Sequence, residues 1–399
     1  MSMGIYIHIP FCVQKCNYCD FLSFETEATN ALPTPCNESG HVGAARETFD
    51  YVGHVSALIH EIQTTKLPQV IDTIYIGGGT PTALPSSLLC KILDAVTEHV
   101  GHALQPDAEI TVEANPGTLT REYLTALKSH GVTRLSMGLQ TTKPRLLKAL
   151  GRIHTMDEFL ENFHTAREVG FDNINVDLMF ALPGQNLTDW QETLDEVIAL
   201  SPEHISAYSL TPAENTPLWD DLENRKITLP DDTTDRKMYH LAREMLATAG
   251  YIHYELSNFA KPGFESRHNV NCWRRVPYIG FGLGAHSFDG YKRWSNTEDM
   301  GEYLKMHRSY EDMTLVGAAC GCQQDCTMQE HLSEKDHLAE TMILGLRLTQ
   351  GVPEAAVPSI YNEEVATLIK KGLLTCKDGH VCLTPLGMDL ANQVFAAFI

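Results

Sequence analysis

The chain of 399 residues is acidic and rich in apolar side chains, and both properties narrow its class. Hydrophobic residues make up 43% of it and charged residues 20%, which is enough to bury a sizeable core and excludes a disordered or fibrous protein. The 30 Lys and Arg against 51 Asp and Glu leave a net charge of −21. Because such a surface repels phosphate backbones, we expect no nucleic-acid partner.

The location of the protein is predicted from its apolar runs, its N-terminus and its cysteines. No stretch reaches about 18 consecutive apolar residues, so we expect no membrane-spanning helix. The first ten residues lack the basic start of a secretory signal and the Arg/Ser-rich pattern of a transit peptide. The 11 cysteines are an odd number, which favours free thiols and ligands over a disulfide framework. The sequence therefore predicts a cytoplasmic protein.

Short β-branched and aromatic runs alternate with longer amphipathic stretches through the first half of the chain. The predicted strands are Gly4–Ile9, Thr73–Gly77, Ala108–Glu113, Arg134–Gly138, Asn173–Phe180 and His204–Leu210. The predicted helices between them are Thr48–Lys66, Ser86–Val100, Thr120–His130, Met156–Val169 and Thr188–Leu200. This alternation predicts a parallel sheet, built either as a partial or complete barrel or as a doubly wound sheet. In each case ligands belong at the carboxyl ends of the strands.

Other segments break this rhythm. The stretch Glu25–Ala45, with several Pro, Asn, Ser and Gly residues, is predicted to be a surface loop. Near the C-terminus we expect a helix over Glu330–Leu348, another over Glu363–Gly372, a small β-wing that includes His380–Thr384, and a final helix. This order is typical of a winged-helix-like α+β domain, for which the acidic chain favours an intramolecular role over DNA binding.

Three cysteines in the loop after the first strand form the strongest candidate site. Cys12, Cys16 and Cys19 have the spacing C-x3-C-x2-C, and three soft thiolates so close together suit an iron–sulfur, zinc or copper centre. Structural zinc usually takes four protein ligands, whereas only three are evident here. A four-iron cluster with three thiolates would leave one iron open to another ligand.

The stretch from Tyr6 to Phe21, YIHIPFCVQKCNYCDF, resembles the opening of the radical S-adenosylmethionine (SAM) superfamily, in its oxygen-independent coproporphyrinogen oxidase-like branch. The resemblance implies a (β/α)6 partial barrel whose three cysteines hold a [4Fe–4S] cluster, with SAM on the fourth iron and a 5′-deoxyadenosyl radical as the product of its reduction. It also implies that Tyr18 packs by the adenine of SAM and that Tyr6 matches the tyrosine of the family's first strand. The expected parts are a core barrel over 1–215, an extension over 216–310 that completes the barrel, and the C-terminal domain over 311–399.

Further positions match the SAM pocket of this branch. The run Gly77-Gly78-Gly79-Thr80 follows a strand, where glycine lets the backbone approach a ligand and direct N–H groups at it. Charged residues on a buried strand are either ion-paired or in contact with a ligand. The resemblance implies SAM contacts for the following residues: Gly78, Gly79, Thr80, Glu113, Gln140, Arg152, Asp177, Thr211 and His286.

Two features separate the members of the branch. Oxidases carry a further cysteine two positions after the third cluster cysteine, where this chain has Phe21, and the Asp-Phe ending resembles the HemW-type haem chaperones. The run from His268 to Trp273, HNVNCW, resembles their H-N-x-x-Y-W haem motif, in which His268 would ligate haem iron. Cys272 replaces the motif's tyrosine and is itself a potential thiolate ligand.

Two functions from different classes follow from this resemblance. One is a haem chaperone that carries a cluster and SAM and transfers haem to apo-haem proteins such as respiratory cytochromes. The other is a radical SAM enzyme of porphyrin biosynthesis, an oxygen-independent coproporphyrinogen III oxidase. Phe21 and His268 favour the first. Peripheral membrane contact, a homodimer and an accessory metal at Cys320, Cys322 and Cys326 are left open.

Overall fold

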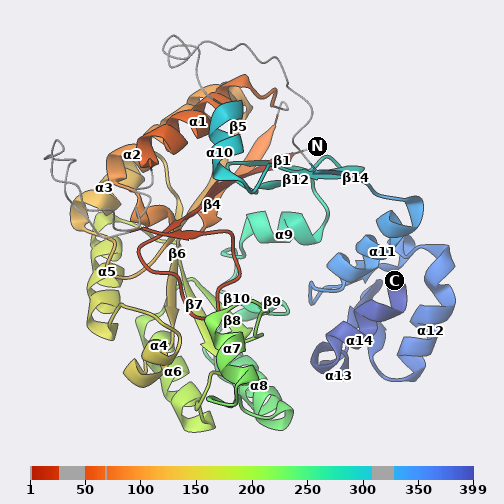
Figure 1. Ribbon diagram of the computed structural model, residues 1–399. Helices are drawn as coiled ribbons and strands as arrows, with labels where there is room; N and C mark the ends of the chain where they lie inside the picture. Colours follow the sequence, from red (N-terminus) through yellow and green to blue (C-terminus); the bar gives the residue numbers. More distant parts are fainter. Residues whose placement is uncertain (1, 27–49, 68–69, 308–327) are drawn as a thin grey trace, which may run out of the picture.

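The computed structural model describes residues 2–26, 50–67, 70–307 and 328–399. Its largest part is built on one large sheet, with helices around the outer side of that sheet (Figure 1). The strand order is β14-β13-β12-β11-β1-β4-β5-β6-β7-β8-β10-β9. From β11 to β8 all neighbours run parallel, and both flanks are antiparallel. The bounds of the parallel strands are β1 Met3–Ile9, β4 Ile71–Gly78, β5 Leu104–Ala114, β6 Arg134–Gln140, β7 Ile174–Phe180, β8 His204–Ser209 and β11 Tyr278–Phe281.

The two ends of this sheet do not pair with each other within the described part of the chain, so the predicted partial barrel is confirmed. The stretch 216–310, which was predicted to be an extension, contributes strands at both edges of the sheet. One edge takes β9 and β10, and the other takes β11, β12 and β13. The bounds of the added strands are β9 Ile252–Glu255, β10 Asn258–Ala260, β12 His286–Phe288, β13 Lys292–Ser295 and β14 Met328–His331.

The five helices predicted in the first half are present, and local signals explain where they begin and end. Helix α5 (Met156–Val169) starts at a capping box of Thr155 and Glu158 and ends at Gly170, whose φ of 98° is left-handed. Helices α4, α7 and α8 were not predicted. The bounds of these helices are α1 Tyr51–Thr64, α2 Ser86–Val100, α3 Arg121–Ser129, α4 Pro144–Ala149, α6 Leu187–Leu200, α7 Pro217–Glu223 and α8 Asp232–Thr248.

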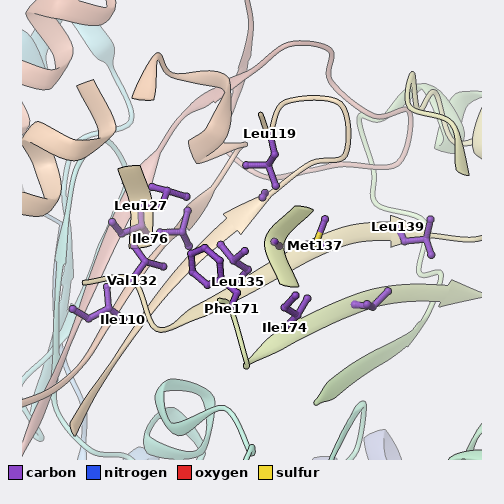
Figure 2. Packing of buried hydrophobic residues seen from close by; sticks show 14 of the residues in the cluster. Ile76, Ile110, Leu119, Leu127, Val132, Leu135, Met137, Leu139, Phe171 and Ile174 are labelled. Atoms are coloured by element: carbon purple, nitrogen blue, oxygen red, sulfur yellow. The ribbon is translucent and has the colours of Figure 1, made fainter. Parts of the chain in front are cut away.

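The core lies between the parallel strands and their covering helices. Figure 2 shows part of it, where Ile76, Ile110 and Leu135 from three neighbouring strands meet Leu127 of α3 and Phe171. These side chains are at most 5% exposed. Burial of each contributes about 1.5–3 kcal/mol, so this layer fixes the strand ends that carry the site.

The C-terminal part forms its own small core around a three-stranded sheet, as the winged-helix-like prediction requires. Two details were predicted wrongly. The helix expected from Glu330 begins at Glu334, because Ser333 caps it with Asp336 while residues 328–331 pair with β13. The single final helix is two short ones. The bounds are α11 Glu334–Gly345, β15 Val352–Pro353, α12 Asn362–Lys370, β16 Leu374–Lys377, β17 His380–Leu383, α13 Pro385–Asp389 and α14 Ala391–Phe395.

The segment after α11 joins this part to the edge of the large sheet. Thr349 donates its N–H to the carbonyl of Tyr254 (3.0 Å), and Leu256 donates to the carbonyl of Arg347 (3.1 Å). The Arg347 guanidinium lies 4.2 Å from the ring centroid of Trp273, the last residue of helix α9 (Arg267–Trp273). Helix α9 therefore lies between the sheet and the C-terminal helices (Figure 1).

Two predicted features fall outside the described residues. The predicted loop Glu25–Ala45 is described only to Thr26, where Phe24–Glu25 forms β3 and pairs with β2 (Phe11–Cys12). Cys320, Cys322 and Cys326 also lie outside the described residues.

Candidate functional site

A cavity of ≈ 350 Å³ opens at the carboxyl ends of the parallel strands, which is where the sequence predicts the site. Eleven of the predicted residues line it: Cys12, Cys16, Cys19, Tyr18, Gly78, Gly79, Thr80, Glu113, Gln140, Arg152 and Asp177. They come from the loop after β1, from β5, β6 and β7, from the end of β4 and from the segment after α4, so the topology gathers residues that are far apart in the chain.

The cysteine loop is fastened to the rest of this edge through its backbone. Gly79 donates its N–H to the carbonyl of Ile9 (2.8 Å), and Thr80 donates to that of Phe11 (2.7 Å). A Cβ on Gly79 would lie 2.7 Å from the same Phe11 oxygen, so the close approach requires glycine here. The prediction that these N–H groups point at a ligand is therefore wrong, because they hold the cysteine loop instead.

Polar donors approach two of the three sulfur atoms. Thr80 Oγ1 lies 3.6 Å from Cys12 Sγ, and Arg152 Nη1 lies 3.4 Å from Cys16 Sγ. Donors of this kind suit a thiolate that shares its charge with iron. In the described part of the chain, no three His, Cys, Asp or Glu side chains are arranged around a single metal ion. A cluster sets a different requirement, because each thiolate binds its own iron.

Burial favours the protonated form of two of the three thiols, those of Cys12 and Cys19. Burial raises the pKa of Cys12, and burial raises that of Cys19 to about 11. A metal centre that binds these thiols must therefore displace protons, which makes its binding depend on pH. All seven cysteines among the described residues are free thiols.

Glu113 is held by hydrogen bonds, and no residue in the described ranges forms an ion pair with it. Its carboxylate accepts from Tyr75 Oη (2.6 Å) and from the Gly78 N–H (3.2 Å). Burial raises its pKa to about 7, and Asp177 adds to the rise. Asp177 in turn accepts from Ser136 Oγ (3.1 Å) and Asn175 Nδ2 (2.9 Å). The alternative of structural ion pairs therefore finds no support in these two carboxylates.

Arg152 and Gln140 lie close to Gly138, which helps to line the cavity. Arg152 Nη2 donates to Asn115 Oδ1 (2.8 Å) and to the carbonyl of Gly138. A Cβ on Gly138 would lie 2.9 Å from Asn115 Oδ1 and 3.1 Å from Arg152 Nη2, so glycine makes room for this cluster. Gln140 has a left-handed φ of 68°, and the pairing of β6 with β7 shifts between Gly138 and Gln140.

Three residues expected at SAM do not line this cavity. The ring of Tyr6 stacks on that of Tyr75, which does line the cavity, with the two ring centroids 6.2 Å apart. The Tyr6 hydroxyl lies 2.9 Å from His8 Nδ1. Thr211 and His286 are exposed. Their predicted SAM contacts stay predictions.

The sequence interpretation missed several lining residues. Asn115 follows Glu113 closely at a predicted strand end, so its position could have been found. Tyr75 and Tyr208 lie within parallel strands, and hydrophobic alternation alone does not say which face of such a strand meets a ligand. The missed residues are Gln14, Tyr75, Ala114, Asn115, Ser136, Gly138, Met179 and Tyr208.

The haem-motif run forms helix α9 and not a loop, and its histidine is buried. His268 is 7% exposed, its Nδ1 lies 3.0 Å from Thr73 Oγ1, and its ring stacks on Tyr75 at 5.0 Å. Burial, with a smaller effect of Arg134, lowers its pKa to about 4. Burial also raises the pKa of the Cys272 thiol to about 11. Neither side chain lines the cysteine cavity.

Family models match both parts of the chain. The model described as the radical SAM superfamily matches residues 6–197, and the HemN C-terminal domain matches 332–390. Among solved structures, the coproporphyrinogen III oxidase HemN from Escherichia coli superposes with a TM-score of 0.77 at 20% identity, covering 100% of this chain and 90% of that one. At this identity the likeness establishes the fold, so sheet, cysteine loop and C-terminal domain together define the radical SAM class.

Curated relatives narrow the class further. The haem chaperone HemW of Bacillus subtilis is 34% identical over 99% of this chain and 98% of its own length. HemW of E. coli is 38% identical over 71% of this chain and 69% of its own. The chain belongs to the HemW family. No helix among the described residues has the length and apolar character needed to cross a membrane.

Proposed function

We propose that this protein is a haem chaperone that binds haem and delivers it to apo-haem proteins, with respiratory cytochromes as the expected recipients. The observation that carries the proposal is Phe21, which lines the cysteine cavity with its side chain 61% exposed. Oxidases of the same branch have a cysteine there, whereas phenylalanine has neither a proton to give nor a thiol to react. Membership of the HemW family supports the same function.

The cavity residues fit a [4Fe–4S] cluster and SAM. Cys12, Cys16 and Cys19 would hold the cluster, which with SAM supplies one-electron reductive chemistry when bound. Arg152 would orient the methionyl carboxylate of SAM, and Glu113 and Asp177 would accept from its ribose hydroxyls. The hydrogen bonds already made by these residues fix their positions before any ligand enters.

Substitutions of the charged residues that line the cysteine cavity should weaken SAM binding without unfolding the protein. Asp177→Asn and Arg152→Gln each remove a charge-assisted hydrogen bond, which lowers the affinity for SAM about ten- to hundredfold, or by roughly 1.5–3 kcal/mol. Equilibrium dialysis of reconstituted protein with labelled SAM measures this effect. Glu98→Gln, on the exposed side of α2, serves as the control and should bind like the parent. Parent-like affinity in both cavity variants would place SAM elsewhere.

The chaperone and oxidase functions differ in one anaerobic assay. The reconstituted protein, given SAM and a reductant, should leave coproporphyrinogen III unconverted while it binds ferric haem in a parallel titration. We expect Phe21→Cys to leave haem binding unchanged, because this residue belongs to the cluster cavity. Protoporphyrinogen formed over multiple turnovers by the parent protein would establish the oxidase instead.

We also propose that the chain is organised in three parts. Residues 1–215 would form the SAM core, 216–310 the extension with the haem-motif run, and 311–399 the C-terminal domain. The matched ranges 6–197 and 332–390 support the outer two. We place the protein in the cytoplasm, where its free thiols would stay reduced.

A further inference from the structure

A second cavity, of ≈ 630 Å³, lies between helix α9 and the C-terminal domain and is larger than the ≈ 350 Å³ cysteine cavity. Its walls come from both parts of the chain: Trp273 and Arg274 at the end of α9, Tyr291 after β12, His337 of α11, Ala356, and His380 of β17. We infer that this cavity binds haem, with the His380 imidazole as an axial ligand of the iron. The inference rests on the proposed chaperone function and names its binding site.

The tautomer of His380 is the one that a metal ligand needs. Its Nδ1 lies 3.0 Å from the carbonyl oxygen of Asp378, which can only accept, so Nδ1 carries the proton. Nε2 therefore keeps its lone pair, and the hydrogen bond at Nδ1 orients the ring. His337 has the opposite arrangement, because its Nδ1 accepts from Arg275 Nη2 at 2.7 Å and its proton is on Nε2. Of these two cavity histidines, only His380 is prepared to ligate iron.

The charge around the cavity suits the propionates of haem. Two arginines and one aspartate line it, although the chain as a whole has a net charge of −21. Arg275 is paired with Glu340, and Asp289 accepts from the backbone N–H groups of Tyr291 and Lys292. Arg274 is exposed, and its side chain has no ion pair or hydrogen bond to any described residue. It is therefore available to a carboxylate.

Aromatic and apolar groups supply the surface for a porphyrin ring. Trp273, Tyr291, Pro277 and Val352 line the cavity, and the Trp273 indole N–H is buried without an acceptor among the described residues. Trp273 closes the haem-motif run, so the run reaches this cavity through its tryptophan. The buried His268, held by Thr73, lines neither this cavity nor the cysteine cavity. The volume lies within the range of roughly 300–1,000 Å³ typical of ligand pockets.

The role of His380 as the iron ligand is tested by titrating the full-length protein with ferric haem and recording the absorbance and electron paramagnetic resonance spectra. His380→Ala should lose the imidazole-ligated spectrum and raise the Kd by at least about tenfold, and added imidazole should restore the spectrum. His337→Gln, in the same cavity, should keep the parent spectrum. Thermal melting of each variant verifies that it is folded. A parent-like spectrum in His380→Ala, together with its loss in His268→Ala, would overturn the inference.

Two more variants test the cavity and leave His380 unchanged. Arg274→Gln should weaken binding of haem about tenfold and leave binding of haem dimethyl ester unchanged, because the ester has no carboxylates. Ala356→Trp fills the cavity from an exposed position and should block both ligands. If the parent binds no haem, the proposed function fails. If the parent binds haem and Ala356→Trp binds it equally well, the function stands and this site is wrong.

Discussion

Replacing Cys12, Cys16 or Cys19 by alanine is expected to abolish the iron–sulfur absorption of anaerobically reconstituted protein. Two remaining thiolates leave two irons of the cluster without protein ligands, so we expect complete loss and not a partial decrease. Iron and sulfide content, visible absorbance and the electron paramagnetic resonance of the reduced protein measure it. In the parent, addition of SAM should perturb these spectra, because three thiolates leave one iron open.

The fold should survive each of these substitutions, because the loop is fixed by its backbone. Gly79 and Thr80 hold its first part, and the Asn17 N–H donates to the carbonyl of Leu150 (3.0 Å). Cys376→Ala, at an exposed thiol of β16, is the matched control and should keep the full cluster. Stoichiometric zinc, with no iron retained in the absence of oxygen, would contradict the radical SAM assignment of the three cysteines.

Glu113→Gln is expected to stabilise the SAM-free protein at pH 8 while it weakens SAM binding. The pKa of Glu113 is raised from its ordinary 4.5 to about 7 by burial, so between these values the folded state binds more protons than the unfolded state. Stability therefore falls as the pH rises through this window. Above this window, the ionised Glu113 side chain lowers the free energy of unfolding by about 3 kcal/mol. Below pH 4.5 the side chain is protonated in both states, and its ionisation does not affect stability.

The amide removes most of this cost, because it stays neutral and still bonds to Tyr75 and the Gly78 N–H. Urea unfolding at pH 8 and at pH 5 should show a gain of up to about 3 kcal/mol at the higher pH and little difference at the lower one. Glu98→Gln changes the same charge on the surface and should show no such pH dependence. A loss of stability at pH 8 would show that the Glu113 carboxylate is structural. A gain in stability with lower SAM affinity is the signature of a ligand-binding group.

The sequence by itself determined the features that depend on short stretches of chain. Cys12, Cys16 and Cys19 lie within eight residues, so their spacing alone brings three thiols together. Amphipathic periods predicted the helices of the first half, because each helix buries one face against a sheet. Glu113 and Asp177 were predicted from their places at strand ends, since parallel strands open their carboxyl ends on one side.

Only the tertiary structure decided which side chains of the strands and of the extension face a ligand. Tyr75 and Tyr208 turn towards the cysteine cavity from parallel strands, whose near-continuous apolar runs give no signal from hydrophobic alternation. The motif suggested an accessible His268, but packing of α9 on β4 buries it beside Thr73. The second cavity joins Trp273 to His380, more than a hundred positions apart. No local pattern links them, because the docking of one folded part on another creates their proximity.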